Sequence, residues 1–253
     1  MDKLIYLVPA MGLIGLLYTM LKFNWVSKQD AGTDRMKEIS NYIAEGAMAF
    51  LKAEWKILGY FVVIVGLLLA AGAGRRFGAD KLLAPLSDGR SVAATACAAL
   101  ATGVDRVVAV VRVGDAALSR QLQACGATVL ECVDANQGMG ASLAFGVSQS
   151  PAAGWLIALA DMPFIETCDV TRVADALRAG APIAALGSPL DHAHPVGFSA
   201  RYGRQLKQLG GDRGARALLA THVNDIVWLP PARAASQRDI DTVEDWQSAL
   251  RER

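Results

Sequence analysis

A glycine-rich, basic segment follows an apolar run and has the composition of a phosphate-binding loop. It reads LAAGAGRRFGADK over residues 69–81. Gly72 and Gly74 allow the backbone to turn sharply and to approach a ligand closely. Successive main-chain N–H groups there, with a following helix amino end, form an anion site. Arg76 and Lys81 add positive charge, so the segment predicts contacts to a phosphorylated ligand.

The spacing of this loop differs from that of two common nucleotide-binding loops. No Gly-Lys-Ser/Thr occurs, which excludes the G-x-x-x-x-G-K-[ST] phosphate loop. The dinucleotide fingerprint needs a third glycine where Phe77 stands, and residues 91–95 contain no acid to hold a ribose. The sequence therefore disfavours a nicotinamide-dependent oxidoreductase.

Asp161 lies where an open α/β sheet places its ligand-binding groups. It follows the buried-strand pattern WLIAL (155–159), and Pro163 ends the strand. Its carboxylate is therefore expected at the carboxyl end of a parallel strand, where such sheets bind ligands. The alternative is an aspartate that only caps a turn or a helix.

A second acidic group lies near the end of the sequence. Asp239 and Asp241 bracket Ile240 and would point the same way in an extended segment, while Ile240 faces the core. Thr242 and Asp245 have capping-box-like spacing, so a helix is expected to start here, and capping it is the alternative role of one carboxylate. Two carboxylate ligands, with phosphate oxygens and waters, suit Mg²⁺.

These groups require a sheet that brings the ends of distant strands together. Apolar runs and helical periodicities predict one three-layer, Rossmann-like α/β domain with a mostly parallel sheet over residues 62–253. The expected strands cover residues 62–70, 106–112, 127–132, 155–160, 182–187 and 224–229. The expected helices cover residues 89–102, 115–124, 140–148, 169–179, 201–208, 213–222 and 242–252.

The apolar run over residues 57–71 admits two interpretations, a second membrane span or the first strand of the sheet. The run is short for a span, and an apolar run that ends in a glycine-rich turn is typical of a central parallel strand. The basic residues within 22–56 place that segment in the cytoplasm. A return across the membrane would place the domain outside the cytoplasm, away from the phosphorylated ligand that its loop predicts, so residues 62–70 are interpreted as the first strand.

Two helices are expected before the domain, in a segment covering residues 1–58. Residues 4–21 carry no charge and just reach the length of a bilayer span, so they predict a transmembrane helix, with a secretory signal peptide as the rival interpretation. Residues 33–58 have apolar side chains at helical spacing and predict an amphipathic helix. We therefore expect a cytoplasmic catalytic domain that one helix anchors to the inner membrane.

The composition argues against several classes of protein. A net charge of +1 gives no bulk attraction to nucleic acid. The four cysteines form no C-x-x-C pair, and three histidines are too few to favour a multi-histidine metal centre. The cysteines are expected to be reduced thiols in a cytosolic domain.

The start of the sequence resembles the amino-terminal part of membrane-bound, ion-pumping pyrophosphatases. The resemblance depends on the first apolar segment and on KEISNYIAEGAMAFLKAEWKIL (37–58), which matches the pattern I-x-x-x-I-x-x-G-A-x-A-F-L-x-x-E-[YW]. The pyrophosphate-binding acidic clusters of that family lie on later helices, so the resemblance does not imply pumping. A truncated pump piece without catalysis is an alternative interpretation of the chain.

Six further segments occur in the order of another family's motifs. They are LLLAAGAGRRFGADKLL (67–83), QGMGASLAFGV (137–147), ALADMPF (158–164), HPVGFS (194–199), LGGDRGARALL (209–219) and DIDTVEDW (239–246), in which Val243 replaces the usual proline. Through these motifs, residues 65–253 resemble the MobA-like nucleotidyltransferases, which attach a nucleotide to the molybdenum cofactor. The resemblance implies Mg²⁺-dependent transfer from CTP to a molybdopterin-type cofactor, with release of pyrophosphate.

The resemblance also implies roles for single residues. Arg76, Lys81 and Asp161 would be catalytic, with the two cations on the phosphates. Asp161 and Asp241 would bind Mg²⁺, and Asp241 is preferred to Asp239 for this role. The residues implied to bind the nucleotide are Leu69, Ala70, Ala71, Gly72, Gly74, Arg76, Lys81, Gly138 and Ser142.

The identity of the base and of the acceptor depends on fewer residues. Ala71 stands where guanylyl-transferring relatives tend to have glycine, which indicates CTP, with GTP as the alternative donor. A plain helix-entry turn is the alternative role for Gly138 and Ser142. His194 and Asp212 would contact the acceptor, with a structural histidine and a helix cap as the alternatives. The implied partners are a nucleoside triphosphate, the molybdopterin-type acceptor and a molybdoenzyme or maturation factor; a sugar or polyol phosphate is the alternative acceptor.

Overall fold

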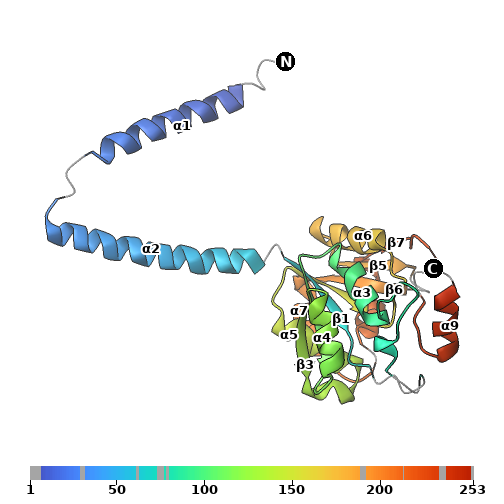
Figure 1. The fold of residues 1–253 in the computed structure, drawn as a ribbon. Coiled ribbons are helices and arrows are strands. Elements are labelled where there is room, and N and C mark those ends of the chain that lie inside the picture. Colours follow the sequence, from blue (N-terminus) through green and yellow to red (C-terminus); the bar gives the residue numbers. More distant parts are fainter. Residues whose placement is uncertain are drawn as a thin grey trace. The chain divides into compact units, whose positions relative to one another are not determined.

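A computed structural model of the chain describes residues 7–28, 32–60, 63–72, 77, 80–188, 192–212, 214–233 and 238–251. It divides into two compact units, Met1–Lys56 and Ile57–Arg253. Helix α1 (Leu7–Val26) lies in the first unit, and helix α2 (Asp34–Tyr60) begins there. The strands that the structure describes all lie in the second unit (Figure 1).

The second unit contains a mixed sheet that is mostly parallel. Within the described residues the strand order is β3-β2-β1-β4-β6-β5-β7. Strand β6 runs antiparallel to β4 and β5, and the other neighbouring pairs are parallel. The strands are β1 (Ile64–Leu69), β2 (Arg106–Arg112), β3 (Thr128–Cys132), β4 (Gly154–Leu159), β5 (Ile183–Gly187), β6 (His192–Ser199) and β7 (Ile226–Leu229).

Helices cover both faces of this sheet, which makes three layers as the sequence predicted. Helices α3, α4 and α6 bury their apolar residues against one face, and α5, α7 and α8 against the other. Alternate residues of β1 face opposite layers, so that Leu68 belongs to the first core and Leu67 to the second. The helices are α3 (Val92–Ala101), α4 (Ala116–Ala124), α5 (Met139–Gln149), α6 (Thr167–Arg178), α7 (Gly203–Lys207), α8 (Arg216–Thr221) and α9 (Val243–Arg251).

The apolar run over residues 57–71 is divided between two elements. Residues 57–60 end helix α2, and β1 begins at Ile64. Each residue of β1 is buried, and the strand pairs with β2 on one side and β4 on the other. The interpretation as a central strand is therefore confirmed, and a second membrane span in this run is excluded.

The range 4–21, which was expected to form a transmembrane helix, is mostly covered by α1. No helix among the described residues is long and apolar enough to cross a membrane. The structure thus gives no support to that expectation, and residues 4–6 lie outside the described part of the chain.

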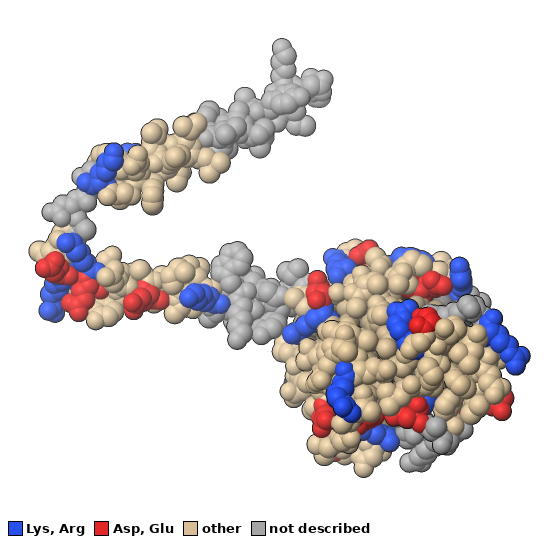
Figure 2. Space-filling model, in the orientation of Figure 1, with Lys and Arg blue, Asp and Glu red and all other residues tan. Residues whose placement is uncertain are grey.

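Charged side chains are spread over the second unit without a large area of one sign on the face in Figure 2. Lys and Arg alternate there with Asp and Glu, in keeping with the formal net charge of +1. A nucleic-acid site would show as a cluster or stripe of basic side chains. That face carries no such stripe.

Strand β6 was not predicted from the sequence. Its residues contain only an acceptor-side motif at the level of sequence, and Pro195 and Gly197 are both unfavourable in strands. In the structure β6 fills the space between β4 and β5, and Phe198 is fully buried. A Cβ on Gly197 would lie 2.7 Å from Leu177 Cδ1. Close packing against α6 therefore explains a glycine in this strand.

Phe198→Ala is expected to lower the free energy of unfolding by about 3–5 kcal/mol, because it leaves a cavity between the sheet and its helices. Urea denaturation followed by circular dichroism measures the change. Val227→Ala on β7 is the matched control, because Val227 is 42% exposed, and it should cost much less. Similar losses in the two variants would show that β6 is not an interior strand.

Candidate active site

The ends of β1 and β4 bring the predicted phosphate loop and Asp161 together. Leu69 and Leu159 lie opposite each other in parallel register. The pairing extends beyond the strands, because Ala160 N donates to Leu69 O at 3.1 Å. Asp161 therefore lies at the carboxyl end of a parallel strand, which is the position expected for it.

The visible start of the loop is held against the sheet. Leu69, Ala70 and Ala71 are all buried, with Leu69 8% exposed and Ala71 6% exposed. Arg112 Nε donates to Ala71 O at 2.8 Å and fixes this turn. Gly72, which comes next, is exposed. Two residues that were expected to contact phosphate, Gly74 and Arg76, lie outside the described residues.

Lys81 joins the two aspartates that were expected to bind metal. Its Nζ lies 2.8 Å from Asp161 Oδ2 and 2.8 Å from Asp241 Oδ1. Only 9% of the lysine side chain is exposed. Burial by itself would lower the pKa of Lys81, but hydrogen bonds to Asp161 and Asp241 and their negative charges outweigh it and raise the pKa. The lysine is therefore held as an ammonium between the two carboxylates.

Asp241 is positioned by hydrogen bonds on both sides. Ile240, which is fully buried, donates its backbone N–H to Asp161 O at 2.9 Å. Asp241 N and Thr242 N donate to Asp245 Oδ2 at 3.1 and 2.8 Å, and Asp245 N donates to Thr242 Oγ1 at 3.1 Å. The hydrogen bonds from Thr242 and then Asp241 lower the pKa of Asp245. The predicted capping box thus starts α9 and fixes Asp241 beside Asp161.

Ile240 ties this segment to a third hydrophobic cluster of the domain. The cluster also contains Phe77, Leu86, Val92 and Ala249. It joins the end of the phosphate loop to α3 and α9. Ile240 thus faces the core, as the alternation in the sequence predicted.

Asp239 lies at the edge of the same acidic group and lines an adjoining cavity. Burial, and next the negative charge of Asp241, raise the pKa of Asp239. Among the described residues, Asp161 Oδ1 is buried and has no hydrogen-bond partner. Three carboxylates around one ammonium leave an excess of negative charge, and a partnerless carboxylate oxygen is a suitable ligand for a hard cation.

The acidic group fits a metal ion whose coordination is completed by phosphate oxygens and waters. Within the described residues, no set of three or more His, Cys, Asp or Glu side chains is arranged to bind a metal by itself. Mg²⁺ is commonly bound by one or two carboxylates together with phosphate oxygens and waters. Asp161 and Asp241 are a donor pair of this kind.

The start of α5 packs tightly against the loop over residues 210–212. Gly140 N donates to Gly211 O at 2.8 Å. Gly138 has a φ of +118°, and a Cβ there would lie 2.4 Å from Asp212 Oδ1. Gly138 was expected on the nucleotide side and Asp212 on the acceptor side, and the structure brings these two segments into direct contact.

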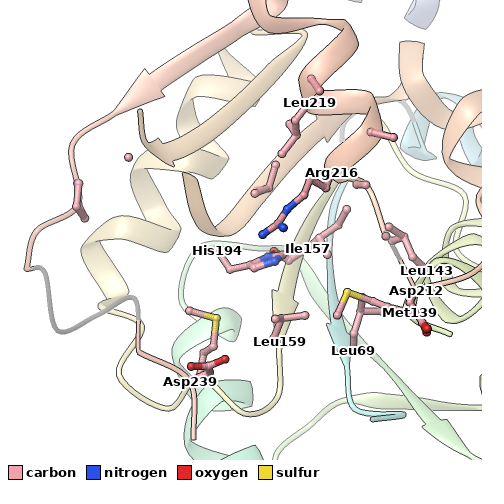
Figure 3. Close-up of a pocket in the computed structure, with 18 of the residues that line it drawn as sticks. Leu69, Met139, Leu143, Ile157, Leu159, His194, Asp212, Arg216, Leu219 and Asp239 are labelled. Carbon is pink, nitrogen blue, oxygen red and sulfur yellow. The ribbon is translucent and has the colours of Figure 1, made fainter. Parts of the chain in front are cut away.

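A cavity of about 1210 Å³ lies beside the acidic group (Figure 3). Most of its wall is apolar and includes Leu143, Ile157 and Leu219. His194 and Asp212, which were expected to contact the acceptor, both line it. The backbone carbonyl of Ile157 accepts a hydrogen bond from His194 Nδ1 at 3.1 Å, which orients the imidazole ring. Ser142, which was expected on the nucleotide, is buried in the first turn of α5.

Sequence reasoning missed two arginines of this cavity. Arg216 and Arg238 both line it. Arg216 lies inside the motif 209–219, and Arg238 directly precedes Asp239. Arg216 takes the arginine position of the pattern L-x-G-D-x-G-x-R-x-L-L, which was the signal that could have found it. Arg238 gave only a weak signal, because arginine is common on any protein surface.

Comparison with known proteins agrees with this geometry. Residues 66–226 match the family model of the MobA-like NTP transferase domain. The chain belongs to this family. The MobA-like domain is 30% identical over 200 residues to PucB, a purine catabolism protein of Bacillus subtilis, which covers 74% of this chain and 96% of PucB. Its fold resembles that of Rv0371c from Mycobacterium tuberculosis H37Rv, with a TM-score of 0.64 and 24% identity over 76% of this chain and 100% of that one.

The pump-like resemblance covers only a short stretch. A K(+)-insensitive pyrophosphate-energized proton pump of Methanosarcina mazei is 38% identical to this chain over 69 residues. These residues are 27% of this chain and 10% of the pump, so the chain spans about a tenth of that relative's length. Both resemblances drawn from the sequence, to the MobA-like family and to pyrophosphatase pumps, are confirmed.

Gly140→Ala is expected to lower the free energy of unfolding by about 1–3 kcal/mol through overpacking. The reason is that its Cβ would lie 2.7 Å from Gly210 O. Guanidinium denaturation of the two proteins gives the difference. Gly210→Ala is the matched control, because a Cβ on Gly210 meets no atom within 4 Å. Equal losses in both variants would mean that the contact between α5 and this loop is not tight.

Proposed function

We propose that residues 62–253 catalyse Mg²⁺-dependent transfer of the cytidylyl group of CTP to a phosphate of a molybdopterin-type acceptor, with release of pyrophosphate. Membership of the MobA-like family supports nucleotidyl transfer. The observation that carries the proposal is the bridge from Lys81 to Asp161 and Asp241 at the strand ends, next to a large cavity.

Asp161 and Asp241 would hold the metal, which would supply positive charge to the phosphates of the donor during transfer. This assignment is supported by the donor pair, by the excess of negative charge and by Asp161 Oδ1, which has no hydrogen-bond partner in the described part of the chain. A further structure of Rv0371c, with a TM-score of 0.59 and 24% identity to this chain, is described as a complex with manganese. Divalent metal use by this chain is in keeping with that relative.

Lys81 would neutralise charge during the reaction. An oxygen of the acceptor phosphate attacks the α-phosphorus of CTP, the bond to the β-phosphate oxygen breaks, and pyrophosphate leaves with the bonding electrons. The ammonium of Lys81, and the guanidinium of Arg76 in the loop, would stabilise the negative charge that grows on this leaving group. Because the acceptor attacks directly, no covalent enzyme intermediate is needed. The strand ends and the capped α9 supply the fixed positions on which such catalysis depends.

The remaining nucleotide-side and acceptor-side residues keep the roles that the resemblance implies. Gly72 and Gly74 would present backbone N–H groups to the phosphates. Gly138 and Ser142 would lie near the base or ribose. His194 and Asp212, which line the cavity, would contact the acceptor.

The character of the cavity supports a ring-bearing acceptor over a sugar or polyol phosphate. Its wall is mostly aliphatic, with Leu143, Ile157, Leu159, Val196 and Leu219 among the lining residues. A polyol would need many hydrogen-bonding partners, whereas a fused-ring compound buries apolar faces and needs few. The substrates are nucleoside triphosphate and a labile cofactor, so we propose that the reaction takes place in the cytoplasm and that a molybdoenzyme or maturation factor receives the product.

Asp161→Asn and Asp241→Asn are each expected to reduce pyrophosphate release from CTP and purified cofactor by at least about 100-fold, because each removes a charged metal ligand. A coupled pyrophosphate assay over a range of Mg²⁺ concentrations measures this loss. Asp134→Asn is the control, since Asp134 is exposed and its side chain accepts a hydrogen bond from Gln137. Full activity of Asp161→Asn would remove the metal assignment, and a larger loss in Asp239→Asn than in Asp241→Asn would exchange their roles.

Turnover with CTP is expected to exceed turnover with GTP by about tenfold or more, if the buried methyl group of Ala71 narrows the space beside the base. Ala71→Gly should reduce this preference. Steady-state rates with each nucleotide at saturating cofactor measure the ratio. A preference of the unaltered protein for GTP would contradict the assignment of CTP.

A further inference from the structure

Arg216 is exposed and places a positive charge in the cavity beside His194 (Figure 3). Figure 3 shows its guanidinium pointing into the cavity toward the imidazole of His194 and the strand residue Ile157. In the part of the chain that the structure describes, Arg216 makes no ion pair or side-chain hydrogen bond. A guanidinium offers five N–H donors in a planar fork, and this fork matches carboxylate and phosphate oxygens.

The other arginine of the cavity is engaged differently. The guanidinium carbon of Arg238 lies 5.0 Å from the centre of the Phe164 ring, in a cation–π contact. Arg238 also directly precedes the aspartates of the acidic group. Its charge is thus already used within the protein. Of these two cavity arginines, Arg216 is the one that makes no cation–π contact among the described residues.

Arg216 is presented by a well-supported segment. It begins α8, whose Leu219 is buried in the core beneath the sheet. The preceding loop is held by the hydrogen bond from Gly140 N to Gly211 O, and a Cβ on Gly214 would already lie 3.2 Å from Met139 Sδ. A guanidinium on a supported backbone loses less freedom when it binds an anion than one on a mobile loop.

We infer that Arg216 binds an oxyanion, either phosphate or carboxylate, that is attached to the ring-bearing body of the acceptor. This inference rests on the proposed function and specifies its acceptor side. The apolar wall would take the flat body of the acceptor, and the paired N–H donors of Arg216 would take its charged end. Arg216 is accordingly a binding residue that sets which acceptors are used.

The test uses ring compounds that carry each oxyanion. Phenyl phosphate and benzoate are titrated into the full-length protein by isothermal titration calorimetry, with inorganic phosphate as the probe without a ring. At least one of the two ring compounds should bind more tightly than inorganic phosphate, and which of them does so distinguishes phosphate from carboxylate. Arg216→Gln should weaken that binding at least tenfold, or about 1.4 kcal/mol. Arg216→Lys keeps the charge but loses the planar fork of donors, so its affinity for the ring compound should lie between those of the unaltered protein and Arg216→Gln.

Arg204→Gln is the matched control, because Arg204 is an exposed arginine on the neighbouring α7 and does not line the cavity. It should leave binding of the ring compounds unchanged. The inference is overturned if neither ring compound binds, if Arg216→Gln and Arg204→Gln behave alike, or if Arg216→Gln weakens CTP binding as much as it weakens the ring compound. The last result would assign Arg216 to the nucleotide.

This experiment is independent of turnover. If Arg216-dependent binding is found but no cytidylyl transfer to purified cofactor occurs, the anion subsite stands and the proposed acceptor is wrong. If transfer occurs and Arg216→Gln leaves the KM for the acceptor unchanged, the reaction stands and the subsite is wrong.

Discussion

The ionic bridge that Lys81 makes to Asp161 and Asp241 is the interaction on which the site depends. It joins three segments of the chain, because Asp161 lies 80 residues and Asp241 lies 160 residues after the lysine in the sequence. Two nearby carboxylates repel each other, and the largely buried ammonium of Lys81 between them offsets that repulsion. The same group that supports the acidic pair is therefore the one proposed to neutralise phosphate during transfer.

Much of the domain serves to hold this bridge in place. Strands β1 and β4 bring the loop and Asp161 to one edge of the sheet. The buried Ile240 and the capping box of α9 bring Asp241 to the same place. These supports combine parallel strand pairing, a buried apolar side chain and the side-chain hydrogen bonds of the capping box. Such preorganised positions are what charge stabilisation in a transition state requires.

A second contact joins the proposed nucleotide-binding segment to the proposed acceptor-binding segment. The first turn of α5 and the loop over residues 210–212 pack so closely that Gly138 and Gly140 leave no room for side chains. This loop contains Asp212 and precedes Arg216, so a shift of α5 would also move these two residues on the proposed acceptor side. The proposed anion subsite and the proposed base-binding segment are thus mechanically connected.

Local pattern in the sequence was sufficient for most of the fold. Buried parallel strands read as continuous apolar runs, and β1, β2, β3, β4, β5 and β7 lie close to their predicted positions. The capping box at Thr242 and the inward Ile240 were also predictable, because both depend on residues that are neighbours in the sequence. The family was recognisable for the same reason, since its motifs are short and ordered.

Tertiary structure decided what depends on distant residues. Strand β6 contains a proline and a glycine, and only the space between β4 and β5, with close packing on α6, makes it a strand. The bridge at Lys81 and the cavity position of Arg216 follow from strand order and loop packing, which no local pattern encodes. Residue type and spacing thus determined which groups are available for chemistry, and only the fold determined which of them meet, because Coulomb and hydrogen-bond interactions act over a few ångströms in space regardless of separation along the chain.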